Sequence, residues 1–534
     1  MASSMREFVV DGEASADTDV PAALAGSVTL NGSLAWANGG RTRTSRRNWL
    51  DTFDWRLYRA GLTLEQAAAR GRIELLLTGR DGNLLASEVL AAGRGPHWPS
   101  LVSQLPAGPL RELVEPVAGV RALGPVVRAS SKVAQLRAMN DDAKTVARLD
   151  IDRMSVTFPE PAAVPARLTL TPVRGYAGVT DRIGWAITEV PGINAARGSA
   201  LETALTAVGL RAGDLAGKTT AVQLSPSMPA AAALATLLTA QLDAIEANVP
   251  GTIRDIDTEF LHDLRIAVRR TRSVMKLCGR ALPAGLASEF RPEFRWLGDL
   301  TTPTRDLDVY LLGYGRMTAG LVAAAPADLS PFHDYLMRSR AAQHRRLAAG
   351  LRSARFARLT TRWRAALKEI GSARKRPTVA RLAAARISTA QRRALQAGQL
   401  ISAASPAENL HELRKRCKEL RYLVEMFGSL HDPAQRWQAV RELKALQDCL
   451  GAFQDAEVQR GEIRGFASQL LSDRRVPAET LLAMGEIAAG LAVAQREARR
   501  EFDGRFADFA SPASQARLTA LTRTDGRTRA AGGA

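Results

Sequence analysis

Residues 261–272 read LHDLRIAVRRTR, and residues 410–422 read LHELRKRCKELRY, about 150 residues further along the chain. In each segment a histidine is followed by cations three, seven and ten residues later. These offsets are close to multiples of 3.6, so on an α-helix they place four side chains in one stripe. Apolar residues with helical spacing run beside each stripe. Each segment is therefore predicted to be a helix that buries one face and presents a row of cations next to it.

The two rows of cations form the candidate binding site. Like charges three or four residues apart on a helix repel by a few tenths of a kcal/mol per pair. A stripe of this kind that occurs twice indicates that a polyanion binds there. The first quartet is His262, Arg265, Arg269 and Arg272, and the second is His411, Arg414, Lys418 and Arg421.

Other residues extend this hypothesis. Flanking basic positions are predicted to contribute to binding: Arg270, Lys276 and Lys415. A lower tier of candidates contains Arg305, Arg338, Arg345, Arg352 and Tyr422. A solvated surface face is the alternative for the arginines of this tier, and an internal salt bridge is the alternative for Arg305. For the two histidines the alternative is a structural role in the helix core. Neither helix offers a second His or Cys ligand on the same face, so no metal site is predicted.

The charge balance supports an anionic partner. The 534 residues carry a net charge of +19. About +3 of this falls in residues 1–220 and about +16 in residues 221–534. A basic chain of this kind attracts polyanions, whether phosphate polymers or nucleic acid. Aromatic residues make up only 5% of the chain, which is few for stacking bases.

The chain is predicted to be an α+β multidomain protein. Residues 1–212 have strand-like alternation, at 26–30, 72–77, 144–152 and 167–173, with helices near 96–116 and 199–208. Residues 213–230 form a candidate linker. Residues 231–511 follow helical periodicity and divide into two related repeats, about 231–375 and 376–511. A helix break is expected at Thr302-Pro-Thr304, and the basic tail 512–534 is expected to be disordered.

The helical half resembles the CHAD family, the conserved-histidine α-helical domain. The resemblance rests on LHDLRIAVRRTRSVMK, RWLGDLTTPTRDLDVYL, LHELRKRCKELRYLVEMF and LKALQDCLGAFQDAEV, which occur in the family's order. It implies a helical bundle of two repeats whose basic residues line a groove. It also implies that inorganic polyphosphate is the ligand and that the protein is located at polyphosphate granules.

The N-terminal half is similar to a CYTH domain, the β-barrel fold of inorganic triphosphatases and adenylyl cyclases. The match is NWLDTFDWRLYRAGLTLEQ, residues 48–66. The family's catalytic Glu-x-Glu-x-Lys is absent, because the first segment offers only Glu7. Carboxylates of that kind hold the divalent metal that triphosphate hydrolysis requires. A degenerate, non-catalytic domain is therefore expected, with no required cofactor. Mg²⁺ or Mn²⁺ would matter only for a residual triphosphatase activity.

Three functions follow from these patterns, and a polyphosphate-binding protein is the leading one. A triphosphatase or polyphosphate hydrolase acting through the CYTH-like domain is the second, and a non-specific nucleic-acid binder is the third. Three cysteines in apolar helical patterns indicate buried thiols in a reducing compartment. No secretory signal or membrane span is predicted, so a cytoplasmic location is expected. No protein partner can be named from these residues.

Overall fold

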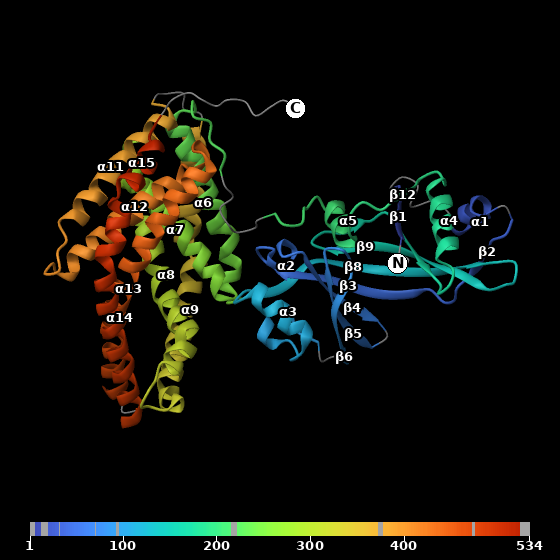
Figure 1. The fold of residues 1–534 in the computed structure, drawn as a ribbon, viewed down its shortest axis with the longest axis horizontal. Helices are drawn as coiled ribbons and strands as arrows, with labels where there is room; N and C mark the ends of the chain where they lie inside the picture. The colour runs from blue at the N-terminus through green and yellow to red at the C-terminus, as the bar shows by residue number, and fades with distance from the viewer. Residues whose placement is uncertain are drawn as a thin grey trace. The chain divides into compact units, whose positions relative to one another are not determined.

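The computed structural model describes residues 6–11, 20–30, 32–69, 71–91, 95–214, 222–371, 377–472 and 476–523. The chain separates into two compact units, Met1–Ala216 and Gly217–Ala534. We call them the sheet unit and the helical unit (Figure 1). The predicted fold class, a β-rich domain followed by an all-α domain, is confirmed.

The sheet unit is built on one antiparallel sheet. Its strands follow the order β12-β1-β11-β9-β8-β3-β4-β5-β6, while β10 pairs with β9, and β2 and β7 pair with β8. No pairing between the two ends of this path, β12 and β6, is found among the described residues. The strands are β1 (Arg6–Val10), β2 (Ala35–Asn38), β3 (Arg43–Thr52), β4 (Leu62–Ala69), β5 (Arg72–Gly79), β6 (Leu84–Ala91), β7 (Ser100–Leu101), β8 (Ala122–Met139), β9 (Thr145–Phe158), β10 (Ala162–Ala163), β11 (Arg167–Pro172) and β12 (Ile193–Ala195).

Short helices cover this sheet and complete its cores. Helices α1 and α4 pack on the β1, β9 and β11 region, α3 packs on β4 and β5, and α5 packs on β8 and β9. The helices are α1 (Val20–Ser27), α2 (Arg56–Arg59), η1 (Val102–Gln104), α3 (Pro109–Ala118), α4 (Ala177–Thr188) and α5 (Ala200–Ala207).

Two predictions for this unit are wrong. Residues 26–30 do not form a strand, because α1 extends to Ser27 and buries Val20 and Leu24, one helical turn apart. The helix expected near 96–116 starts only at Pro109, after β7 and η1. The predicted strands at 72–77, 144–152 and 167–173 correspond to β5, β9 and β11.

The helical unit is a bundle with one main core. Every helix from α6 to α15 contributes buried residues to that core. The helices are α6 (Ala230–Ile253), α7 (Thr258–Cys278), η2 (Gly279–Ala281), α8 (Leu286–Ala319), η3 (Pro326–Leu329), α9 (Ser330–Leu351), α10 (Ala354–Gly371), α11 (Val379–Gln399), α12 (Ala407–Met426), η4 (Gly428–Leu430), α13 (Pro433–Ser472), α14 (Ala478–Ala510) and α15 (Pro512–Ala520).

The two repeats supply equivalent helices in the same order. His262 and His411 are separated by 149 residues, the difference between 411 and 262. With this spacing α6, α7 and α8 correspond to α11, α12 and α13. Figure 1 shows α8 with α9 and α13 with α14 as two long hairpins extending from the bundle. The hairpins share a second core, which includes Phe332 and Leu336 from one and Ile463 and Leu470 from the other.

Two predictions for the helical unit are also wrong. No break occurs at Pro303, because α8 continues from Leu286 to Ala319. Just before the proline, the hydroxyls of Thr301 and Thr302 donate to the carbonyls of Leu297 and Gly298, one turn back along α8, at 3.1 and 2.8 Å. The tail is not disordered from residue 512, since α15 begins there and buries Leu518 in the main core. Residues 524–534 lie outside the described residues.

Helix α6 is the most apolar long helix of the unit. Among the described residues it is the one helix that passes a length and composition test for crossing a membrane. Most of it is buried inside the bundle, including 61% of its most apolar window. Core helices of soluble bundles pass the same test. The packing of α6 in the main core accounts for its composition.

Candidate anion-binding surface

Helices α7 and α12 bury the faces that their apolar spacing predicts. Leu264 and Val268 on α7, and Leu413 and Leu420 on α12, are at most 2% exposed. Asp257 caps α7 by accepting hydrogen bonds from the N–H groups of Glu259 and Phe260, at 2.9 and 3.2 Å. The cations lie on the neighbouring face of each helix. Arg269, Arg272, Lys276 and Lys415 are exposed, while His262, Arg265, Arg270, His411, Arg414, Lys418, Arg421 and Tyr422 are half-buried.

The two quartets meet at the ring of Tyr422. The guanidinium carbons of Arg269, from the first repeat, and Arg421, from the second, lie 5.9 and 5.7 Å from its centroid. An ion pair of 2.6 Å between Lys276 and Glu419 also joins α7 to α12. Residues about 150 positions apart thus form one continuous basic area, which we call the α7–α12 surface.

The pKa of Lys418 reflects how close these cations are to one another. Burial lowers its pKa to about 8, and the positive charges of Arg414 and Arg269 act in the same direction. Arg269 comes from the first repeat and Arg414 from the second, so charge from both repeats acts on one ammonium group. An anion bound at this point would relieve that repulsion.

Arg265 and Arg272 are held against α8. Arg265 donates from Nη1 to Oγ1 of Thr302 at 2.7 Å and to Oγ1 of Thr301 at 3.2 Å. Burial lowers the pKa of Arg265, and the carboxylate of Asp306 opposes this shift. A side chain at Gly298 would meet Nη1 of Arg272 at 2.6 Å, so the glycine permits this close approach. Arg265 is thus held by α8, whereas Arg272 runs close beside α8 and is exposed.

The equivalent residues of the second repeat contact α13. Arg414 donates from Nη2 to Asp455 at 2.9 Å, and His411 Nδ1 lies 2.6 Å from Oε1 of Gln454. Arg421 forms an ion pair with Glu425 at 3.6 Å. Carboxylates thus neutralise part of the second quartet. Within the described residues, no carboxylate oxygen lies within 4 Å of Arg269 or Arg272.

Several predicted residues are not brought to this surface. Lys415 pairs with Glu412 at 3.7 Å. Arg338, Arg345 and Arg352 are exposed and, among the described residues, form no hydrogen bond or ion pair with either quartet. Arg270 faces a separate hollow next to Tyr422. Arg305 donates weakly to the carbonyl of Thr258 at 3.4 Å, which links α8 to the start of α7.

The salt bridge expected near Arg305 belongs to a different arginine. Arg340 on α9 donates to both carboxylate oxygens of Asp255, at 2.5 and 2.6 Å. Its Nε donates to the buried Asp308 at 2.6 Å. This triad ties α8 and α9 to the turn before α7. Sequence reasoning missed it because the partners are distant in the chain and no local spacing joins them.

The polar residues of the sheet unit pair with one another. Arg47 donates to both oxygens of Glu65, at 2.6 and 2.7 Å, and to Asp152 at 3.0 Å. The Nε of Arg167 donates to Glu7 at 3.1 Å. Glu7, the carboxylate that remains in the first segment, is thus engaged by an arginine. No group of three or more His, Cys, Asp or Glu side chains that could hold a metal occurs among the described residues.

The segment that suggested a CYTH domain forms a buried turn. Asp51 accepts hydrogen bonds from the backbone N–H groups of Thr52, Leu57 and Tyr58, at 2.6, 3.0 and 2.9 Å. Burial raises the pKa of Asp51 to about 6, against the effect of these donors. Arg121 lies 3.6 Å from Asp54 with both side chains buried. These residues fix the chain between β3 and α2, which is a structural role.

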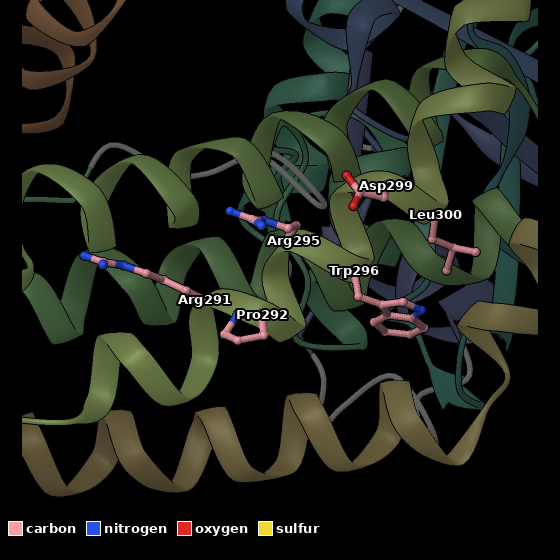
Figure 2. Close-up of a pocket in the computed structure, with 6 residues that line it drawn as sticks. All are labelled: Arg291, Pro292, Arg295, Trp296, Asp299 and Leu300. Carbon is pink, nitrogen blue, oxygen red and sulfur yellow. The ribbon is translucent and has the colours of Figure 1, made fainter.

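A large hollow on α8 contains none of the predicted binding residues. It has a volume of about 470 Å³ and is lined by Arg291, Pro292, Arg295, Trp296, Asp299 and Leu300. Figure 2 shows that Arg291 and Arg295 extend toward the same side. Trp296 stacks with Arg355, whose guanidinium carbon is 4.4 Å from the ring centroid.

Comparison with known proteins identifies the helical unit. Residues 236–464 match the family model of the CHAD domain, so this part of the chain is a CHAD domain. The crystal structure of the CHAD domain from the plant Ricinus communis is similar, with 23% sequence identity and a TM-score of 0.45. The match covers 53% of this chain and 96% of the Ricinus chain. PptA from Streptomyces chartreusis is 18% identical, with a TM-score of 0.41, and covers 52% and 99%.

The sheet unit has neighbours of another kind. A candidate adenylyl cyclase from Hippeastrum with a dominant triphosphatase activity is 12% identical, with a TM-score of 0.27. It covers 39% of this chain and 95% of its own. A search of curated proteins returns no match.

Proposed function

We propose that the helical unit binds inorganic polyphosphate along the α7–α12 surface. The observation that carries the proposal is the meeting of the two quartets at Tyr422. Cations from both repeats lie close enough there to act, together with burial, on Lys418, whose pKa is lowered to about 8. Such a concentration of positive charge is relieved when an anion binds and releases counterions.

The chemistry of the side chains supports a phosphate polymer. Guanidinium groups donate two parallel hydrogen bonds to phosphate oxygens, and an ammonium group acts as a point charge. Arg269 and Arg272 are exposed on consecutive turns of α7, so they can contact successive phosphoryl units. Among the described residues of the two motif segments, 261–272 and 410–422, Tyr422 is the one aromatic side chain. A single ring offers little surface on which bases could stack. Polyphosphate therefore fits better than RNA. No metal is required for this contact.

Calorimetric titration at fixed salt tests the proposal. The full-length protein would be titrated with long-chain polyphosphate and, separately, with single-stranded RNA of matched charge. The variant Arg269→Gln/Arg272→Gln removes two exposed cations without disturbing the contacts of Arg265 to α8. Arg496→Gln/Arg500→Gln, two exposed arginines of α14, is the control with the same loss of charge.

We expect tight binding of polyphosphate, weaker binding of RNA, and a loss of about tenfold or more in the first variant only, from two charge-assisted contacts. Equal affinity for both polymers, with equal losses in the two variants, would show that net charge alone attracts the ligand. That result would make the protein a non-specific polyanion binder, and nucleic acid would then be as good a partner.

A further inference from the structure

A second cationic hollow lies at the end of the α7 stripe. It has a volume of about 630 Å³ and is formed by the C-terminal end of α7, η2, the start of α8 and one face of α11. Five of its lining residues are cations, and none is an Asp or Glu: Lys276, Arg280, Arg291, Arg386 and Arg393. We call this the cationic hollow. Apart from Lys276, its basic residues belong neither to the quartets nor to the positions that flank them.

Few of these cations are neutralised. Lys276 pairs with Glu419, and Arg291 donates to the carbonyl of Met275 at 2.9 Å. Among the described residues, no carboxylate forms an ion pair with Arg280, Arg386 or Arg393. Grouping like charges around a concave surface is unfavourable unless an anion occupies it.

The pseudo-symmetry of the bundle provides an internal control. The 149-residue spacing relates Lys276 to Glu425 and Arg386 to Leu237. The same spacing relates Arg280 to Ser429, Arg291 to Val440 and Arg393 to Ala244, so none of the five cations has a basic counterpart in the other repeat.

Part of this charge difference lies in α6 and α11. Residues 230–253 of α6 contain no Lys or Arg and two acidic residues, Asp243 and Glu246. The equivalent α11 carries Arg381, Arg386, Arg392 and Arg393 and no acidic residue. The repeats keep equivalent helices in the same order but differ in charge at these positions. A general excess of basic residues does not explain a difference between equivalent positions.

The cationic hollow continues the α7–α12 surface. Lys276 follows Arg272 by one helical turn, about 6 Å along the axis of α7. Arg291 lines both the cationic hollow and the hollow of Figure 2, where Arg295 extends to the same side. Basic side chains therefore continue from the first quartet onto the N-terminal half of α8.

From this asymmetry we infer that the cationic hollow is a further phosphate-binding subsite, which takes phosphoryl units of the polymer beyond those held by the quartets. A bound chain would then leave the α7–α12 surface in one direction, past the C-terminal end of α7. This inference rests on the proposed function. The ligand class is a chain of phosphate groups long enough to span both the quartets and the hollow.

Calorimetry of the variant Arg386→Gln/Arg393→Gln with long-chain polyphosphate tests the subsite. We expect about tenfold weaker binding, and a slope of log affinity against log salt that is smaller by roughly one to two, since two phosphate contacts are lost. The control Arg496→Gln/Arg500→Gln should stay within about twofold of the unmodified protein. Thermal unfolding of each variant would verify that the helical unit remains folded.

Hydrogen exchange of the unmodified protein tests the direction. Long-chain polyphosphate should slow amide exchange in residues 279–285, which border the cationic hollow, and leave the equivalent residues 428–434 unchanged. Equal protection of the two segments, or an Arg386→Gln/Arg393→Gln variant that behaves like the control, would overturn the subsite while polyphosphate binding itself stands. If the unmodified protein binds no polyphosphate, the proposed function fails and the subsite fails with it.

Discussion

The sheet unit and the helical unit both contain clustered arginines, but they use them differently. On the sheet, Arg47 and Arg167 are matched with carboxylates from neighbouring strands. On the helices, Arg269 and Arg272 have no carboxylate within 4 Å among the described residues. Paired charges stabilise a fold and leave little attraction for a ligand, whereas unpaired charges destabilise slightly and attract anions. The contrast assigns a structural role to Arg47 and Arg167 and, under the proposed function, a binding role to Arg269 and Arg272.

The largest expected effect is on the stability of the sheet unit. Arg47→Met would leave Glu65 and Asp152 unpaired with side chains only 15% and 16% exposed. We expect the sheet unit to lose about 2–3 kcal/mol of unfolding free energy, somewhat less than a fully buried pair would cost. Denaturant unfolding followed by near-ultraviolet circular dichroism is the measurement, because Arg47 lies 4.6 Å from the ring centroid of Trp49.

Arg43→Met is the matched control for that experiment. Arg43 is 58% exposed and reaches Asp150 only at 3.4 Å, so its loss should cost less than about 0.5 kcal/mol. Polyphosphate affinity should be unchanged in both variants. A clear loss of affinity in Arg47→Met, with the helical unit still folded, would contradict the division between structural and binding charge.

The second effect is a pH dependence of binding that comes from Lys418. Its pKa is lowered to about 8 by burial and by Arg414 and Arg269, and a bound polyanion should raise it again. Below pH 8 the ammonium form predominates, so we expect the strongest binding there. As pH rises through this pKa, the free protein loses the proton and must regain it on binding, so affinity falls by about tenfold between about pH 7 and pH 9.

Calorimetry across this pH range, in two buffers of different ionisation enthalpy, measures the proton uptake directly. Lys418→Arg should bind with little pH dependence up to about pH 9, because arginine keeps its charge. The sheet unit is not expected to contribute to this dependence. If affinity is constant across this range in the unmodified protein, Lys418 does not contact the ligand.

The helical motifs could be predicted from the sequence because the information is local. The spacing of apolar residues places α7 and α12, and Asp257 caps α7 as its position suggests. The continuity of α8 through Pro303 could not be predicted from Thr302-Pro-Thr304 alone, since α8 is buried in the bundle on both sides of the proline, at Leu297 and Thr301 and at Thr304 and Leu307. Tertiary packing outweighed a local signal there.

Only part of the candidate site could be predicted from the sequence. The two quartets could be found, but not that the second is partly neutralised by Asp455 and Glu425. The cationic hollow could not be predicted because Arg386 reaches it from α11, which lies beside the end of α7 only after folding. Spacing along one helix cannot show which other helix will pack against it.

A smaller effect on polyphosphate affinity is expected in the second quartet, where an arginine is paired with a carboxylate as in the sheet unit. Asp455 pairs with Arg414 and is 59% exposed. Asp455→Asn removes a negative charge beside the proposed ligand. Polyphosphate affinity at about pH 7 should therefore rise by about threefold, which corresponds to the free energy of a weak surface ion pair. Unchanged affinity would indicate that Arg414 acts only in holding α12 to α13. Titration at two salt concentrations would show whether the gain is electrostatic.

The smallest effect concerns the stability of the helical unit. If Arg269 and Arg272 are binding charges, their removal should not destabilise the fold. Arg269→Gln/Arg272→Gln relieves repulsion between cations on one helix, worth a few tenths of a kcal/mol per pair, so the helical unit should unfold at the same or a slightly higher denaturant concentration. Measured beside Arg47→Met, this variant separates the two uses of arginine. A destabilisation above about 1 kcal/mol would show that the exposed stripe of α7 also supports the bundle, because an exposed cation with no carboxylate partner should not cost that much.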